Sequence, residues 1–293
     1  MKTFIIRIIA FAMVVGAIII IIEILLGYSN PNEYRYKHNY LQTHLKDIKI
    51  LGLGHSHIAY GINMVALNDS GFNAAIPSRN IFYDAEIVKE FVPKMSNLKT
   101  IILPLGYNFQ YRWDVPDNQK CLMAKYWGYI FPGETPLIKL ESLYGSKRKF
   151  ADIIMQRSTT LIMDSLGDHI ISTHMKNAWN DKQELPMSKN KKNTMFIKEI
   201  KEIARVCRDH NIRLIAITMP CYRTYVAATT PSGISELHAL ADSMRSVYPE
   251  MEYYDFMADK RFDIEDFRDP SHLNELGALK FTAILKNELL PSR

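Results

Sequence analysis

The feature that most constrains this chain is an apolar run at its N-terminus. No charged side chain occurs in Ile8–Ile22, and the run continues to Leu26 across Glu23. Together with the apolar residues before Arg7, the stretch is about long enough to cross a hydrocarbon core of ~30 Å, which takes ~20 residues of helix. We therefore expect residues 1–28 to form a transmembrane anchor.

The residues on either side of the run indicate how the anchor is oriented. Lys2 and Arg7 precede it, and basic residues stay on the cytoplasmic side of a membrane. A cleaved signal peptide would have a shorter apolar region that ends in a small-x-small site, which residues 23–28 lack. The sequence thus predicts an uncleaved single-pass anchor in a bacterial cytoplasmic membrane, with the body on the extracytoplasmic side.

Composition excludes several classes for the remainder. A chain of 293 residues can bury a full core without disulfide bonds. Its three cysteines, Cys121, Cys207 and Cys221, lack C-x-x-C spacing, so we expect buried small side chains rather than a metal site. A net charge of +5 without long runs of like charge is too mild to suggest a nucleic-acid partner. The sequence gives no reason to expect a cofactor.

After a linker over residues 29–47, short apolar runs alternate with helical patterns. The expected strands are 48–53, 72–76, 100–105, 213–218 and 251–256, and the expected helices are 81–95, 195–210, 234–247 and 275–289. Such alternation predicts parallel βαβ units, and hence an α/β three-layer sandwich around a flavodoxin-like, five-stranded parallel sheet. We expect one domain over 48–293, with an insertion at about 109–194 that covers one end of the sheet.

Two short motifs stand where a parallel sheet binds its ligands, outside the carboxyl ends of the strands. The first strand ends in Gly54-His55-Ser56-His57. A serine on a strand-to-helix turn is exposed beside backbone N–H groups, the geometry that a nucleophile and an oxyanion hole require. Serine is also a favourable helix N-cap, so this motif alone leaves both interpretations open.

The second motif precedes the last expected helix. Asp269 stands three residues before His272, and across one turn its carboxylate can orient the imidazole and stabilise its cation. Taken alone, a capping aspartate with an incidental histidine explains the motif equally well. Together, the two motifs supply a nucleophile, a base and an orienting acid.

The order of these motifs resembles the SGNH/GDSL hydrolase superfamily. Gly54–His57 stands at its G-D-S-type block, although His55 replaces the usual aspartate. Gly106-Tyr107-Asn108 stands at its G-x-N block. No glycine follows the second strand, where Ser78 and Arg79 stand instead. With the anchor, the layout is similar to the D-alanine-transfer protein of teichoic acid operons and to the superfamily's membrane-anchored members in exopolysaccharide loci.

The resemblance implies acyl transfer. Ser56 would attack an ester or thioester carbonyl, His272 would accept its proton, and Asp269 would hold the imidazole in the productive tautomer. The oxyanion donors would be the Ser56 N–H, the Asn108 side chain and, as a candidate, the Ser78 N–H. The candidate substrate-binding residues are His57, Arg79, Tyr107 and Arg223.

The function expected from these residues is that of a serine acyl-ester hydrolase or O-acyltransferase. The substrate would be an acylated cell-surface polysaccharide, another envelope glycan or a small acyl ester, and a membrane-bound O-acyltransferase is a candidate partner. Two alternatives stay open. One is a catalytically quiet binding or assembly partner of such an acyltransferase, and the other is a metal-dependent phosphoesterase that uses His55 and His57.

Overall fold

The computed structural model describes residues 1–28, 32–67, 70–107, 115–145, 163–172, 175 and 194–290. The chain divides into two compact units. Unit 1 comprises Met1–His38 and Val115–Leu161, and unit 2 comprises Asn39–Asp114 and Ile162–Arg293. The predicted insertion therefore contributes residues 115–145 to unit 1 and residues 163–172, 175 and 194 to unit 2, and its other parts lie outside the described residues.

Unit 1 contains the N-terminal apolar helix. This helix, α1 (Lys2–Tyr28), includes a stretch of 26 residues with a mean hydropathy of 3.0, long and apolar enough to cross a membrane. Unit 1 also holds α6 (Asp117–Tyr126), η2 (Pro136–Lys139) and α7 (Glu141–Tyr144), and α2 (Glu33–Thr43) contributes residues to both units.

The one acidic residue of α1 has protein partners. A Glu23 carboxylate oxygen lies 2.7 Å from the Lys125 ammonium of α6, and the other accepts a hydrogen bond of 2.7 Å from the Ser142 N–H of α7. Lys125 also pairs with Glu141 at 3.0 Å. These contacts attach the last turns of α1 to α6 and α7, so the charge that interrupts the apolar run is compensated within unit 1.

Unit 2 is built on five parallel strands, as the sequence predicted. The strands are β1 (Ile50–Gly52), β2 (Gly71–Asn73), β3 (Thr100–Pro104), β4 (Arg213–Thr218) and β5 (Met251–Asp255). Their order in the sheet is β2-β1-β3-β4-β5, and every neighbouring pair is parallel. This is the flavodoxin-like order, in which the connection reverses direction at β1 and β3.

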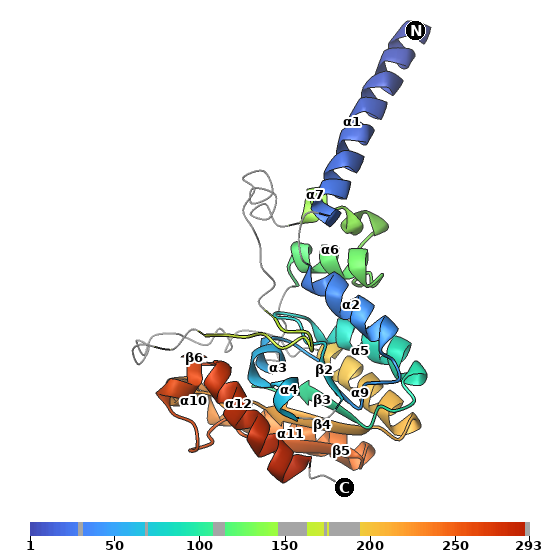
Figure 1. Ribbon diagram of the computed structural model, residues 1–293. Coiled ribbons are helices and arrows are strands. Elements are labelled where there is room, and N and C mark those ends of the chain that lie inside the picture. The colour runs from blue at the N-terminus through green and yellow to red at the C-terminus, as the bar shows by residue number, and fades with distance from the viewer. Residues whose placement is uncertain are drawn as a thin grey trace. The chain divides into compact units, whose positions relative to one another are not determined.

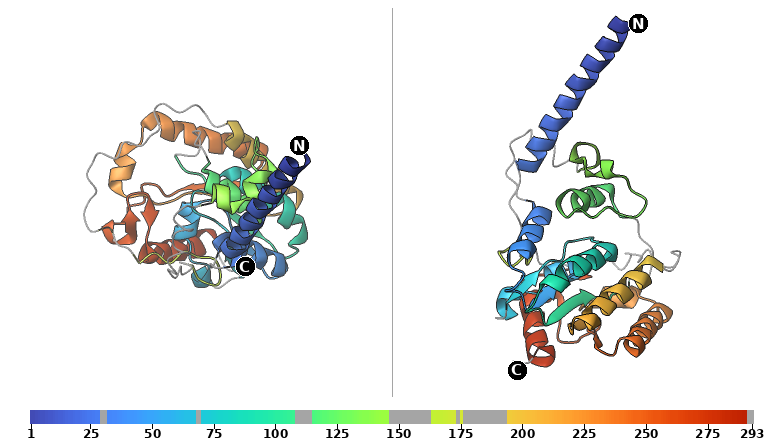
Figure 2. Two further views of the ribbon diagram at one scale, coloured as in Figure 1. Left: turned by 90° about the horizontal axis from the view of Figure 1, so that it is seen from above. Right: turned by 90° about the vertical axis from the view of Figure 1, so that its right-hand side faces the viewer.

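Helices cover both faces of this sheet and complete the three layers (Figure 1). The helices α3 (Ser56–Gly61), α4 (Met64–Leu67) and α12 (Glu275–Ile284), which continues into a π-helical turn, η4 (Leu285–Leu289), pack on one face. On the other face lie α5 (Ile81–Phe91), which continues into η1 (Val92–Lys94), α9 (Thr194–Asp209) and α11 (Pro231–Val247), as Figure 2 shows. The short α10 (Arg223–Ala228) follows β4.

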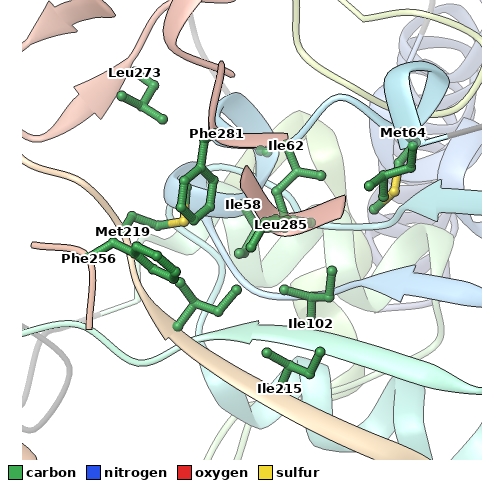
Figure 3. Packing of buried hydrophobic residues seen from close by; sticks show 14 of the residues in the cluster. Ile58, Ile62, Met64, Ile102, Ile215, Met219, Phe256, Leu273, Phe281 and Leu285 are labelled. Atoms are coloured by element: carbon green, nitrogen blue, oxygen red, sulfur yellow. The ribbon is translucent and has the colours of Figure 1, made fainter. Parts of the chain in front are cut away.

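The core beneath α3 and α12 follows from the alternation of side chains along the strands. Ile102 and Ile215 are paired in register on β3 and β4, and both point toward the layer of α3 and α12 (Figure 3). There they meet Ile58 of α3 and Phe281 of α12, all at most 1% exposed. Because successive strand residues alternate between faces, the neighbours Ile101 and Leu214 fill the opposite layer.

Element ends differ from the sequence prediction near the site. The second strand, predicted over 72–76, is Gly71–Asn73 in the structure, although the Ala74 and Ile76 N–H groups still donate to the Gly52 and Gly54 carbonyls at 2.8 and 3.1 Å. An antiparallel pair, β6 (Phe267–Asp269) and β7 (His272–Leu273), was not predicted, and neither was the short η3 (Ile264–Asp266) before it. Strands of two and three residues are too short to leave a readable period-two pattern.

Candidate active site

The turn between β1 and α3 places Ser56 at the carboxyl edge of the sheet. Gly54 in this turn has φ +106°, and a Cβ there would lie 2.3 Å from Cδ of the Pro104 ring on β3. Only glycine combines that backbone conformation with so close an approach. The chain then enters α3 at Ser56, which is half-buried.

Gly54→Ala is expected to destabilise the protein by about 1–3 kcal/mol, because the left-handed conformation and the contact with Pro104 both penalise a Cβ. Gly128→Ala is the matched control, since Gly128 has φ +80° but nothing within 4 Å of its would-be Cβ. Thermal unfolding followed by circular dichroism compares the two variants. If Gly54→Ala loses no more stability than Gly128→Ala, the contact with Pro104 does not contribute to the cost of a Cβ at residue 54.

The structure brings Ser56, His272 and Asp269 into one hydrogen-bonded series. Ser56 Oγ lies 2.8 Å from His272 Nε2. The other ring nitrogen, His272 Nδ1, lies 2.9 and 3.0 Å from the two carboxylate oxygens of Asp269. The aspartate and the histidine are directly paired across the β6–β7 hairpin, which places both side chains on the same face.

The environment of Asp269 keeps its carboxylate ionised. Burial alone would raise the pKa of Asp269, but the hydrogen bond to His272, the histidine's charge and two hydrogen bonds from Ser271 outweigh it and lower the pKa to about 2. The Ser271 N–H and hydroxyl each donate to Asp269 at 3.0 Å. An ionised Asp269 accepts the Nδ1 proton, and this leaves His272 Nε2 free to accept the Ser56 hydroxyl proton. Ser271 was not identified from the sequence.

Two further histidines flank Ser56. His55 is the N-cap of α3, and its Nδ1 accepts the His57 N–H at 3.3 Å, which places the proton of the neutral ring on Nε2. Burial, together with the nearby rings of His57 and His272, holds the pKa of His55 well below its usual range. Burial and His272 likewise lower the pKa of His57 to about 3, against the opposing effect of Asp269. Both rings are therefore neutral near pH 7.

The hypothesis of a metal site at His55 and His57 gains no support from the arrangement of donors. Within the part of the chain that the structure describes, no three His, Cys, Asp or Glu side chains are grouped so that they could hold a metal ion. The His55 ring is instead engaged in capping α3.

His57→Gln is expected to reduce the loss of stability in acid. The folded-state pKa of His57, about 3, lies below the unfolded value of 6.5. Above pH 6.5 both states are neutral, whereas below it the unfolded chain gains a proton that the folded chain does not bind, so stability falls as the pH falls from 6.5 toward 3. This histidine accounts for at most about 1.4 kcal/mol per pH unit in that window.

Urea unfolding at pH 7, 6 and 5 measures the effect as the difference between wild type and His57→Gln. His55 contributes to both curves and cancels in the difference. Parallel stability curves for the two proteins over this range would contradict the depressed pKa of His57.

A buried ion pair fixes the turn that carries Ser56. Asp84 of α5 accepts the Gly54 N–H at 2.8 Å and pairs with the Arg79 guanidinium. Arg79 also donates to the Ala74 carbonyl at 2.7 Å. Burial raises the pKa of Asp84, while the Arg79 charge and the Gly54 N–H oppose that rise. Both partners are 1% exposed, so the structure places Arg79, a candidate substrate contact, in the interior.

The three predicted oxyanion donors differ in their surroundings and in whether the structure describes them. In the described part of the chain, the Ser56 N–H makes no hydrogen bond, although the Ile58 and Ala59 N–H groups that follow it bind the His55 carbonyl. Ser78 is exposed, with φ +62°, in a turn that the bond between Ile76 and Gly54 holds beside the Ser56 turn. Asn108 lies outside the described residues.

The other two candidate substrate contacts, Tyr107 and Arg223, lie in different surroundings. Tyr107 is 3% exposed, and its hydroxyl accepts the Thr230 N–H at 2.8 Å, which anchors the start of α11. Arg223 is exposed at the first residue of α10. The loop before it approaches the candidate site, because the Tyr222 N–H donates to the Pro270 carbonyl at 2.8 Å.

Two further residues near the site, besides Ser271, were missed from the sequence. The ring of Tyr60 meets the His272 ring edge-on, with centroids 5.4 Å apart. Buried Asn274 caps α12 through two N–H groups at 3.0 Å, and its amide donates to the Phe267 carbonyl of β6. Asn274 thereby ties the β6–β7 hairpin to α12. Its position just before a helical pattern was the available signal.

Comparison with known proteins finds several solved structures with a limited similarity to this chain. No known family and no curated protein matches the chain. A Streptococcus pneumonia protein provisionally assigned as a platelet activating factor matches with a TM-score of 0.46 and 12% identity, over 95% of this chain and 97% of its own. A provisionally assigned acylhydrolase of Bacteroides fragilis is also similar, with a TM-score of 0.39 and 11% identity over 86% of this chain and 96% of its own. A GDSL-like lipase of Bacteroides thetaiotaomicron matches with a TM-score of 0.39 and 9% identity over 87% of this chain and 97% of its own.

Proposed function

We propose that this chain is an SGNH-type serine acyl-ester hydrolase or O-acyltransferase. The observation that carries the proposal is the series in which Ser56 Oγ lies 2.8 Å from His272 Nε2 while His272 Nδ1 lies 2.9 Å from Asp269. These are hydrogen-bonding distances for a nucleophile, a general base and the group that orients the base. Each member stands at the carboxyl edge of the parallel sheet, where ligands bind in such folds.

The proposed reaction proceeds through an acyl-enzyme. Ser56 Oγ attacks the acyl carbonyl while His272 Nε2 takes its proton, and the ionised Asp269 stabilises the resulting imidazolium. His272 then returns that proton to the leaving alcohol or thiol. The Ser56 N–H, which has no partner in the described part of the chain, is a donor for the oxyanion. A second donor would come from Ser78 or Asn108, and water or a sugar hydroxyl then takes the acyl group.

The proposed setting is the outer face of a bacterial cytoplasmic membrane. The length and hydropathy of α1 support a single-pass anchor, and Lys2 and Arg7 before it favour a cytoplasmic N-terminus. An enzyme anchored there would meet acylated surface polysaccharide or another envelope glycan, and could exchange acyl groups with a membrane-bound O-acyltransferase. In the proposed organisation, residues 1–28 anchor the chain, 29–47 link it and 48–293 form the catalytic domain.

Hydrolysis of short aryl esters by the full chain in detergent micelles tests the proposal. Ser56→Ala and His272→Ala are each expected to lower kcat by about 10³-fold or more, since each removes a member of a unit that acts together. Ser243→Ala, an exposed serine on α11, is the control and should leave the rate unchanged. If the wild type and both variants show the same background rate on several acyl donors, the result would contradict the proposed hydrolysis and favour a catalytically quiet binding role.

A further inference from the structure

The arginines in the C-terminal part of this chain have acidic partners, with one exception. Six of the seven arginines in residues 194–290 lie within 4 Å of a carboxylate. Arg223 has no carboxylate partner in the described part of the chain, and its guanidinium stacks on the Tyr222 ring at 5.2 Å. Arg223, the exception, therefore lies just after β4, at the edge of the sheet where Ser56 also lies.

This uncompensated charge lies close to the hairpin that carries Asp269 and His272. The residue before Arg223 donates its N–H to the Pro270 carbonyl at the tip of that hairpin, at 2.8 Å. In Figure 1, α10 and β6 lie at the same end of unit 2. Stacking on Tyr222 limits the conformations of the guanidinium, so less entropy is lost when it binds a ligand.

A second arginine, Arg268, lies within the hairpin itself, on β6. The Arg268 guanidinium lies over the Tyr60 ring at 5.0 Å, and Tyr60 in turn contacts the His272 ring. Its Nε lies 3.3 Å from the Asp269 carboxylate, and the side chain is 33% exposed. Its two Nη groups make no hydrogen bond within the described residues. Arg268 thus keeps donors available beside the proposed triad.

We propose that Arg223 and Arg268 form an anion-binding subsite for the substrate of the proposed acyl-transfer reaction, an inference that rests on that function. The substrate class is then an acyl ester that bears a carboxylate or phosphate near the scissile bond. The planar fork of arginine matches both groups bidentately. Two partly exposed guanidinium groups near this hairpin would suit a charged substituent on a glycan or other large acceptor whose acyl group reaches Ser56.

Binding to the Ser56→Ala chain tests the subsite without relying on turnover. Three uncleavable amide analogues are titrated by calorimetry into the full chain in micelles: 4-acetamidophenyl phosphate, 4-acetamidobenzoate and the neutral 4-acetamidobenzamide. Arg223→Gln is expected to lower the binding affinity for either anionic ligand about tenfold or more, and the affinity for the neutral ligand less than about twofold. The two anions distinguish a phosphate-bearing from a carboxylate-bearing substrate, and Arg245→Gln on α11 is the control.

The corresponding acetate esters, assayed with the wild-type serine, separate this proposal from the proposed function. Arg223→Gln should lower kcat/KM at least about tenfold for charged esters and little for the neutral one, with Arg223→Lys in between. Equal losses on all three esters would overturn the subsite in favour of a purely structural role, as would unchanged binding of the anions. If no ester is hydrolysed but the charge-selective binding persists, the acyl-transfer function fails while the anion site stands.

Discussion

Replacing Asp269 with asparagine is expected to lower kcat on an aryl ester by about 10²–10⁴-fold while the fold stays intact. The Asp269 carboxylate accepts the proton on His272 Nδ1 and thereby keeps Nε2, 2.8 Å from Ser56 Oγ, free to accept. An asparagine can turn its amide N–H toward Nδ1, which moves the ring proton to Nε2 and abolishes the base. The pKa of about 2 makes this aspartate ionised at every pH of interest.

The kinetic test compares Asp269→Asn with Ser271→Ala. The serine also donates to the Asp269 carboxylate but is not needed to fix the tautomer, so its loss should cost about tenfold or less in kcat. Circular dichroism of each variant establishes that the fold is retained. An Asp269→Asn enzyme with full activity would exclude Asp269 as the residue that orients His272.

Breaking the buried pair of Arg79 and Asp84 is expected to have the largest effect on stability. Asp84→Leu leaves a guanidinium without its counter-charge at a site that is 1% exposed, and such a loss costs about 3–5 kcal/mol. It also removes the acceptor of the Gly54 N–H and so releases the turn that positions Ser56. Activity should therefore fall beyond what the unfolded fraction accounts for.

Two companion variants separate charge from hydrogen bonding. Asp84→Asn keeps an acceptor for Gly54 and should retain more activity than Asp84→Leu. The double variant Arg79→Met with Asp84→Leu removes both charges and should be more stable than Asp84→Leu alone. Urea unfolding followed by circular dichroism measures each. A double variant no more stable than the single one would show that the unpaired charge is not the source of the loss.

The fold could be predicted because its elements leave strong local signals. Both faces of the sheet are buried, so strands such as Arg213–Thr218 appear as continuous apolar runs, and that strand matches its prediction at both ends. The parallel order follows from helices placed between the strands. The predictions were less accurate for the shortest elements, such as the antiparallel pair β6 and β7, because strands of two or three residues carry no readable alternation.

The grouping of the candidate residues could be predicted from the sequence, whereas the residues that support them could not. Ser56, Asp269 and His272 stand in short motifs at strand ends, and the structure brings them within hydrogen-bonding distance. Asp84 supports the turn from a distant helix, and its single carboxylate on an apolar helical face gave no indication of its partner. Pairs between residues far apart in the chain depend on how the helices pack. No local pattern in a single sequence reveals that packing.

The most direct test of this account is covalent labelling of the full chain with a fluorophosphonate, followed by mass spectrometry of its peptides. Nucleophilic serines form a stable phosphonyl adduct whatever their natural substrate, so the result does not depend on knowing the acyl donor. We expect one adduct, on Ser56, lost in Ser56→Ala and strongly slowed in His272→Ala. Absence of labelling in the folded wild-type chain, or labelling that persists unchanged in His272→Ala, would contradict Ser56 as the activated nucleophile.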